Sequence, residues 1–587
     1  MKHQGFWKKR VVGTCVAVIA VSVGCLPLAH ARGPDLPVEF LGGRLKVEGV
    51  LVGYDEQNPT AGENKIESDG GQQVFLDFGL NAGGFAGEFT INAIHKMADS
   101  AFKFRYGDKV NDGTRHKSEL YSFQASRLGD KADVHLFHHV PRYHWGYEGD
   151  FFGLLKEATD MDDMDVFNGE APSGVEVVGK GNLDGLKVVA GKEIYWGADQ
   201  MMIGKYQFGS RDQYAVLAET DLSKDISKKR LSVQGEFDLG TGSVLRAGVL
   251  SSGSEKIGDS FNFDKDGIVY EDAVKSKDAL ALRLRLEEEL GGSTDFYTEL
   301  NYAGLVANGG ERQEIWDSNM PYSELGNKKT FEVGARIQNG SLMLSPRLFI
   351  RKNLIDPMSS DAQDAGFKRY ETNAPFSVVD NRETNAAEIY LTYDPTPGTF
   401  FYEWDNYLKE DAPFAFNLGI TKIEYPHKAD ARTIVGAQGP FQDNGRPPEE
   451  LIRYSSRLVA NPTETIKVTA DIEAGHQQPI ESNVGLSRFS SVESTVVHNA
   501  RNVYTATYAN DAYGEYDWYR NFGTSYPRQV SLGYERLIGD LGAPSRLGIK
   551  GYKRNLNAES GDEYDDAGQT FRNRHMYEVQ VYYVYAF

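Results

Sequence analysis

One short pattern repeats from residue 40 to the end of the chain: about ten residues of alternating polarity, followed by a turn or a loop. Successive side chains of a β-strand point to opposite faces, so this alternation gives each strand one apolar and one polar face. The pattern continues without a composition break, a long linker or a low-complexity tract. It predicts an all-β fold with a single domain, an antiparallel up-and-down β-barrel.

Segment 280–287 illustrates how the alternation assigns the two faces. Its leucines share one face, whereas Arg283, Arg285 and Glu287 share the other. A charged side chain that faces lipid costs about 2–4 kcal/mol at the bilayer midplane, whereas the interior of a large barrel is polar. We therefore expect the leucines to face lipid and the arginines to face the lumen of a membrane-spanning barrel.

The same argument places a set of basic side chains in the lumen. They are Arg44, Lys46, Arg283, Arg285, Arg336, Arg347, Arg351, Arg453, Arg457, Arg546, Lys550 and Arg554. Guanidinium groups bind carboxylates and phosphates through paired hydrogen bonds, so one hypothesis is a conduit for an anionic solute. In the other, these residues pair across strands with inward acids such as Glu299 and Glu388 and only support the wall.

The last eleven residues carry an unbroken apolar stripe with a period of two. It includes Tyr583 and Tyr585 and ends on Phe587, the terminal residue. This stripe resembles the signal by which the assembly machinery of bacterial outer-membrane barrels recognises its substrates. We therefore interpret Tyr583, Tyr585 and Phe587 as an assembly signal.

The first 31 residues have the organisation of a secretory signal peptide. A basic opening precedes an apolar run over 11–28, and Ala29, His30 and Ala31 form the small-x-small pattern that a signal peptidase cuts after. We expect residues 1–31 to be removed and residues 32–587 to form the barrel. The alternative is a lipoprotein attached through Cys25, but Ser22 fits poorly at the position where a lipobox has Leu.

Cleavage at this point changes the chemistry of the chain. Both cysteines, Cys15 and Cys25, leave with the signal, which excludes disulfides, cysteine-ligated zinc and thiol catalysis. The signal contains four basic and no acidic residues, so the formal net charge falls from −21 to −25. This excess of acid argues against nucleic acid as a partner. No later run of 18 or more apolar residues predicts a membrane-spanning helix.

Short turns alternate with long polar loops along the chain, as expected for short periplasmic turns and long extracellular loops. Counting segments predicts about 22 strands, because a single-chain barrel has an even number. The count ranges from roughly 18 to 26 because segments 200–208, 432–440 and 484–492 are ambiguous. A barrel this wide needs a plug or large loops that fold inward.

Segment 142–172 is the candidate constriction loop. Its apolar spacing from residue 150 onward suits a short helix, and it carries the acids Asp160, Asp162, Asp163 and Asp165. Folded into the lumen, these carboxylates would act as a charge filter or a calcium site. A solvated surface loop is the alternative.

A second candidate calcium site has side-chain oxygens at alternate positions, on Asn262, Asp264 and Asp266, directly before a glycine. This spacing resembles half of a calcium-binding loop. The twelfth position, where a bidentate glutamate belongs, is Ala273. Calcium is the only cofactor that the sequence suggests.

Catalytic signals are weak. His135, His138 and His139 lie together on one expected strand, but the sequence contains neither a nucleophile elbow nor an HExxH motif. We expect no catalytic residues and no enzymatic activity.

The stretch 189–204, with Gly191-Lys192, Gly197 and Gly204, resembles a hairpin of the alginate-export porin family. The resemblance implies a barrel of the Gram-negative outer membrane that passes an anionic polysaccharide outward through an arginine-lined lumen. This chain is longer and more acidic than that family would lead one to expect.

Together these features predict a porin-like channel in the bacterial outer membrane for a polar, anionic solute or polysaccharide. Its expected partners are outer-membrane lipid, the barrel-assembly machinery and the solute. The alternative is a non-conducting barrel that acts as a surface scaffold through its acidic extracellular loops. An open lumen would favour the channel, and a packed lumen would favour the scaffold.

Overall fold

The computed structural model describes mainly the strands and the short turns between them. The described residues are 38–56, 65–96, 117–140, 151–153, 155, 160–161, 164–165, 173–192, 194, 200–222, 229–240, 242–253, 257–258, 260–265, 268–273, 275–291, 293–305, 307, 328–354, 383–396, 412–424, 426, 450–477, 487–510, 528–541, 544–555, 563–564, 570–571 and 573–587. The predicted signal peptide, 1–31, lies outside them.

Twenty-four strands form one antiparallel sheet. They are β1 (Val38–Glu56), β2 (Lys65–Ala82), β3 (Phe85–Lys96), β4 (Lys117–Arg127), β5 (Ala132–His138), β8 (Ser173–Gly179), β9 (Leu186–Lys192), β10 (Met201–Gly209), β11 (Gln213–Asp221), β12 (Lys229–Gly240), β13 (Ser243–Gly253), β16 (Leu280–Leu290), β17 (Thr294–Ala303), β18 (Lys328–Asn339), β19 (Leu342–Asn353), β20 (Thr384–Tyr393), β21 (Phe414–Glu424), β22 (Glu450–Thr463), β23 (Ile466–Gln477), β24 (Ser487–His498), β25 (Asn502–Asn510), β26 (Arg528–Ile538), β27 (Ser545–Asn555) and β30 (Asn573–Ala586).

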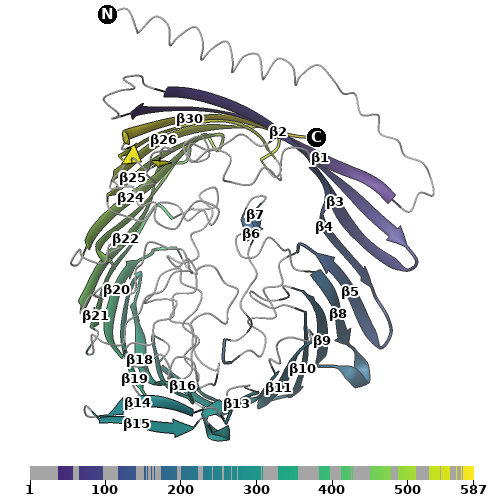
Figure 1. Ribbon diagram of the computed structural model, residues 1–587, viewed down its shortest axis with the longest axis vertical. Coiled ribbons are helices and arrows are strands. Elements are labelled where there is room, and N and C mark those ends of the chain that lie inside the picture. The colour runs from purple at the N-terminus through teal and green to yellow at the C-terminus, as the bar shows by residue number, and fades with distance from the viewer. Residues whose placement is uncertain are drawn as a thin grey trace, which may run out of the picture.

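The sheet closes on itself. Each strand pairs with its neighbour in chain order, and the last strand, β30, pairs with β1 in a register that sets Val47 opposite Tyr583. Figure 1 shows the resulting ring in a view along the barrel. The predicted up-and-down barrel is confirmed, with 24 strands rather than the expected value of about 22. The ambiguous segments 200–208 and 484–492 overlap β10 and β24.

The sequence pattern did not predict two of the short turns. The β10–β11 hairpin turns at residues 210–212, and the β24–β25 hairpin turns at Asn499 and Ala500. Asn499 and Ala500 have φ angles of 54° and 52°, the left-handed conformation that a tight two-residue hairpin requires. The second turn contains Asn499, which tolerates this conformation, but neither glycine nor proline, so its sequence signal is weaker.

The outer face of the sheet is apolar and exposed. On β16, Leu282 is 49% exposed, whereas Arg283 and Arg285 on the opposite face are partly buried. Exposed leucine, isoleucine and phenylalanine side chains recur in this way on most strands. A closed sheet with such a surface is a membrane-spanning barrel, because every backbone group in it is paired within the sheet.

The two ends of the barrel differ in their connections. Except for the longer connection between β20 and β21, short turns join the strands at one end, called here the turn side. The segments at the other end, the loop side, are longer. Both chain ends of the barrel lie on the turn side, where the backbones of Gly43 and Phe587 exchange two hydrogen bonds.

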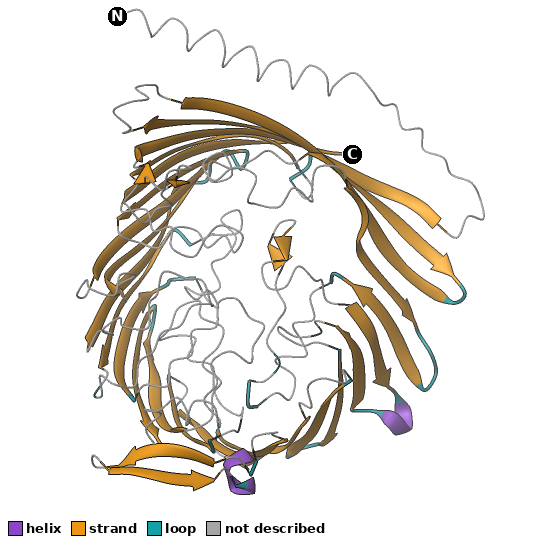
Figure 2. Ribbon diagram, in the orientation of Figure 1, coloured by secondary structure: helices purple, strands orange, loops and turns teal. Residues whose placement is uncertain are grey.

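Little else is regular in the described part of the chain (Figure 2). Two 3-10 helices, η3 (Gly181–Leu183) and η4 (Ser276–Ala279), and three short hairpins accompany the barrel. The strand pair β6 (Asp160–Met161) and β7 (Met164–Asp165) lies inside the ring, whereas the hairpin of β14 (Ser260–Lys265) and β15 (Ile268–Ala273) projects outside it (Figure 1). None of the helices described is long and apolar enough to cross a bilayer.

Candidate functional site

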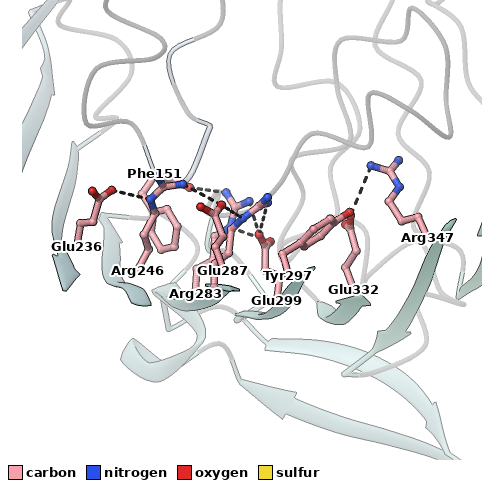
Figure 3. A network of polar contacts seen from close by, with 10 residues as sticks. Phe151, Glu236, Arg246, Arg283, Glu287, Tyr297, Glu299, Glu332 and Arg347 are labelled. Atoms are coloured by element: carbon pink, nitrogen blue, oxygen red, sulfur yellow. Dashed lines mark hydrogen bonds and ion pairs between the residues drawn. The ribbon is translucent and has the colours of Figure 1, made fainter. Parts of the chain in front are cut away.

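Two sets of ion pairs lie side by side on the lumenal wall from β12 to β20, and Tyr297 connects them, with Arg285 over its ring and its hydroxyl donating to Glu332. We call them together the lumenal ion-pair chain. Its charged members are Glu236, Arg246, Arg283, Arg285, Glu287, Glu299, Glu332, Arg347 and Glu388. Figure 3 labels all of these except Arg285 and Glu388. The strand register assembles the lumenal ion-pair chain, because it sets the inward residues of neighbouring strands directly opposite one another, as with Arg285 and Glu299.

Glu299 on β17 is the centre of the first half. Its carboxylate accepts hydrogen bonds from Arg283 at 2.8 Å and from Arg285 at 3.2 Å, and its side chain is only 1% exposed. Arg285 also donates to Glu287 at 2.7 Å, and Glu287 accepts from Arg246 at 3.1 Å. A buried carboxylate with two guanidinium partners is stable only while both partners stay in place.

Glu332 on β18 and Glu388 on β20 organise the second half. Arg347 lies between them, with its guanidinium nitrogens 3.4 Å from Glu332 and 3.6 Å from Glu388. The Tyr297 hydroxyl donates to Glu332 at 2.6 Å, and the Thr421 hydroxyl donates to Glu388 at 3.0 Å. The chain therefore satisfies its own charges, and its arginines are not free positive groups.

The segment around Phe151 docks on this wall. Phe151 donates its backbone N–H to the side-chain oxygen of Gln234 on β12 at 3.0 Å. The Arg283 guanidinium donates to the Phe151 carbonyl and lies 4.8 Å above its ring. These contacts join a residue of the predicted constriction loop to two strands of the barrel. Figure 3 shows Phe151 beside Arg283.

Phe152 and Leu155, which follow Phe151, pack against an apolar surface of the wall, called here the seat. We call Phe151, Phe152 and Leu155 the docked segment. Phe152 is 1% exposed and packs among inward residues of six strands, namely Phe137, Val189, Met201, Ile203, Leu217, Leu250 and Ala281. Gly248 on β13 makes the seat possible, since a Cβ there would lie 2.7 Å from the Phe151 ring. A glycine inside a strand often marks such a close approach.

The acids of the predicted constriction loop are only partly placed. Asp160 and Asp165 pair through their backbones in the β6–β7 hairpin inside the ring. The expected short helix is absent over 160–161 and 164–165, where the backbone is extended. Asp162, Asp163 and the side chains of Asp160 and Asp165 lie outside the described residues. A charge filter formed by these four acids therefore stays a prediction.

Several other predicted lumenal residues have partners on the wall. Arg457 lies 3.4 Å from Asp471, and Lys46 lies 3.7 Å from Glu48. Arg351, 1% exposed, is among the most deeply buried side chains of the barrel. Arg453 lies on the same inward face as Arg457, opposite Thr421.

The remaining predicted basic residues lie on β1, β18 and β27. Arg44, Arg336 and Arg546 are exposed near the turn side, and within the described residues none of the three makes an ion pair. The Arg44 guanidinium lies 4.7 Å above the Phe75 ring, and Lys550 lies 4.9 Å above the Tyr552 ring. The Arg554 side chain lies outside the described residues.

The candidate calcium residues fall on the β14–β15 hairpin. Asn262 and Asp264 belong to β14, where Asp264 pairs with Val269 through its backbone. Their side chains and Asp266 lie outside the described residues. In the part of the chain that the structure describes, no group of three or more histidine, cysteine or acidic side chains could hold a metal ion. Calcium binding here stays a prediction.

The histidines of β5 have partners that the sequence did not suggest. The Oγ atom of Ser126 lies 2.7 Å from Nδ1 of His135, and Glu176 on β8 stands opposite His135. Ser126, His135 and Glu176 lie side by side on the inner face of three paired strands, where they form a polar contact of the wall.

The C-terminal residues of the predicted assembly signal form an aromatic row on the outer face. The Tyr585 ring stacks between those of Tyr583 and Phe587, with centroids 6.2 and 5.8 Å away, and Phe587 also stacks on Phe40. The row therefore lies at the seam where β30 meets β1. Recognition by the assembly machinery stays a prediction.

The closed ring, the exposed apolar exterior and the ionic inner wall define the chain as a large transmembrane β-barrel. No protein-family model matches the chain, and no curated protein matches it.

Three solved structures are similar to the chain over most of its length. A structure of an E. coli P pilus tip assembly intermediate, PapC-PapD-PapK-PapG, has 11% identity and a TM-score of 0.41, covering 95% of this chain and 62% of that one. OccK8 (OprE) of Pseudomonas aeruginosa has 8% identity, a TM-score of 0.28 and coverages of 93% and 98%. OccAB4 of Acinetobacter baumannii has 10% identity, a TM-score of 0.29 and coverages of 94% and 99%.

This chain thus spans 62% of the length of the P pilus chain that it matches. At these identities the assignment of the barrel rests on the pairing of the chain's own strands.

Proposed function

We propose that the protein is a channel of the bacterial outer membrane through which polar solutes pass passively. The observation that carries the proposal is the geometry of the lumenal ion-pair chain. Its pairs join neighbouring strands, as between Arg246 and Glu236 or Arg347 and Glu388, so they run along the wall rather than across the lumen. Barrels of 16–18 strands already leave an aqueous channel, and this one has 24.

The docked segment narrows such a channel without crossing it. Phe151, Phe152 and Leu155 lie against the wall formed by β9 to β16. The docked segment therefore restricts one side of the lumen, and the β6–β7 hairpin that follows it lies inside the ring.

We further propose that the solute is anionic, and that the preference arises on the turn side. The arginines of the ion-pair chain are neutralised by glutamates, so they supply little attraction. Arg44 on β1 and Arg546 on β27 are exposed on the inner face and lie one strand apart, on either side of β30. Two unpaired guanidinium groups at one mouth would attract carboxylate or phosphate groups. The same proposal covers a small anionic solute and an anionic polysaccharide.

Planar-bilayer conductance of the refolded mature protein tests both parts. Steady conductance, with a reversal potential across a KCl gradient that indicates anion preference, is the expected result. Absence of conductance would overturn the channel and favour the scaffold that acts through acidic loops.

The double variant Arg44→Glu/Arg546→Glu should move the reversal potential toward cation preference, because it replaces two positive charges at the mouth by two negative ones. Arg536→Glu is the matched control, since Arg536 lies at the same end of the barrel but on its outer face. An equal shift in both variants would show that the preference does not arise at the inner mouth.

A further inference from the structure

Three neighbouring strands of the barrel, β5, β8 and β9, are shorter than the other strands of the sheet. Each has seven residues, written 7 in its bounds, whereas β4 has 11 and β12 has 12. Seven residues of a strand tilted by about 40° span about 18 Å along the membrane normal, less than the apolar band of about 25 Å around an outer-membrane barrel. We call β5, β8 and β9 the lowered wall, and Figure 1 shows the three strands side by side.

The missing length of the lowered wall is on the loop side. Short turns join β4 to β5 and β8 to β9 on the turn side, so the strands are level there. At the other end, the last residue of β5, His138, stands opposite Phe123, and β4 continues beyond Phe123 to Lys117. The lowered wall therefore ends within the apolar layer of the loop-side leaflet.

The described residues that follow β5 and β9 turn inward and do not extend the wall. His139 has a φ angle of 55°, and its Nδ1 atom donates to the Tyr121 carbonyl at 2.6 Å. Val140 then packs against the apolar cluster that contains Phe152. Beyond β9, Ile194 is 5% exposed and belongs to the same cluster. Apolar side chains therefore form the rim of the lowered wall.

The seat of the docked segment reaches this rim. Two of its residues lie at the loop-side ends of their strands, since Phe137 is the next-to-last residue of β5 and Met201 is the first of β10. Between them, Gly174 on β8 and Gly191 on β9 stand opposite each other, and a Cβ on Gly174 would lie 3.0 Å from the Phe137 ring. The apolar surface of the seat is thus continuous with the rim.

The surroundings of the rim indicate what the seat would receive. The layer that lies beyond the lowered wall in a bilayer consists of alkyl chains. An alkyl chain that crosses the rim would exchange hydrocarbon for apolar side chains and would expose no apolar surface to water. A polar solute or a soluble protein segment would have to cross hydrocarbon to follow the same route, at a cost for each unpaired polar group.

We propose that the lowered wall is a lateral opening through which an alkyl chain passes between the loop-side leaflet and the seat, where it takes the place of the Phe152 ring. The inference goes beyond the passage of polar solutes and rests only on the membrane placement of the barrel. Phe152 fills the seat with its ring, whereas Phe151 is also held by Gln234 and Arg283.

Photocrosslinking of the mature protein, refolded into lipid vesicles, tests this proposal. Two probes carry a diazirine near the end of an alkyl chain, one a free long-chain carboxylic acid and the other a phospholipid with the same chain. Peptide mass spectrometry assigns each crosslink to an outward or an inward residue. Outward residues such as Leu532, 66% exposed, should react in every sample and are the internal reference.

Inward residues of the seat, such as Phe137 and Met201, should react as well. Crosslinks from the acid alone would support a seat for a free amphiphile, and crosslinks from both probes would support a seat for any alkyl chain of the leaflet. If the bilayer instead thins around the lowered wall, as it does around other short spans, only outward residues should react. That result would overturn the proposal.

Phe152→Ala should raise crosslinking in the seat about tenfold, because an apolar vacancy stays dry and binds apolar molecules. Phe349→Ala is the matched control. Phe349 is 2% exposed and packs on the inner face with Ala386, Ile423 and Leu451, but the strands β19 to β22 that carry this cluster have 10 to 14 residues. Its vacancy should therefore receive no crosslinks, and equal crosslinking at the two vacancies would overturn the proposal.

Val140→Asp tests the rim without altering the seat. A charge at the rim should lower crosslinking in the seat about tenfold, because an alkyl chain would have to pass a carboxylate. Unchanged crosslinking in this variant would refute passage over the lowered wall.

Conductance of the same refolded protein separates this proposal from the proposed function. A barrel that conducts but shows no crosslinks in the seat refutes the lateral opening alone. One that shows crosslinks in the seat but does not conduct refutes the channel alone.

Discussion

The lumenal wall from β12 to β20 and the wall from β24 to β27 share one pattern of strand pairing but differ in chemistry. The first carries the lumenal ion-pair chain and receives the docked segment. The second has hydroxyl residues and glycine between charged residues such as Glu535 and Arg546, with Thr507 and Ser531 forming a hydroxyl pair at 2.5 Å and Gly533 beside Thr505. We call them the charged wall and the hydroxyl wall.

The difference shows that a barrel can vary its lumen wall by wall without altering its exterior. A charged wall must keep every partner in place, because a buried charge without its partner is expensive. Hydroxyl groups are smaller and tolerate water as a partner, so their wall constrains the lumen less. Rigidity and narrowing therefore come from the charged wall, and the following predictions test this division.

Glu299→Ala should have the largest effect. It leaves Arg283 and Arg285 without their shared carboxylate, and breaking a buried ion pair costs about 3–5 kcal/mol. Urea unfolding of the protein in lipid vesicles should show a loss of about 3 kcal/mol.

Glu289→Ala on β16 is the matched control, an exposed acid on the same inner face, and it should change stability by less than about 0.5 kcal/mol. Equal losses in the two variants would mean that the charged wall derives no special rigidity from its pairing.

Gly248→Leu should release the docked segment, because the new side chain occupies the space of the Phe151 and Phe152 rings. In a Leu155→Cys background, the rate of thiol labelling should rise about tenfold, as expected when overpacking removes about 1.4 kcal/mol of docking energy. Conductance should increase as well.

Gly551→Leu on β27 is the control, since a Cβ there meets nothing closer than 3.9 Å. Unchanged labelling in Gly248→Leu would show that the docked segment is held by Arg283 and Gln234 alone.

Thr507→Val should have the smallest effect. It removes one hydroxyl of the Thr507–Ser531 pair and should cost about 1 kcal/mol in the same urea experiment. A loss as large as that of Glu299→Ala would erase the distinction between the two walls.

The alternation of residues predicted much of this architecture. It identified the barrel, and the structure places Arg283, Arg285 and Arg347 on the face opposite the exposed leucines. It missed the turn at Asn499 and Ala500, because those residues adopt positive φ angles without glycine. It also passed over Gly248, although a glycine within an alternating strand is a signal of close approach.

Whether the lumenal arginines are free or paired depends on the register between strands. Arg285 and Glu299 are adjacent only because β16 and β17 align them, and Phe151 reaches Arg283 over a separation of 132 residues. The alternation of residues within one strand does not predict contacts between residues this far apart in the chain.

The sequence by itself determined which side of each strand faces lipid, since a period of two and the cost of a charge in hydrocarbon leave a single solution. Only the tertiary structure decided which charges neutralise one another, which mouth keeps unpaired arginines and where the docked segment lies. Those outcomes depend on the register of 24 strands closed into one ring, a property of the whole sheet and not of any strand in it.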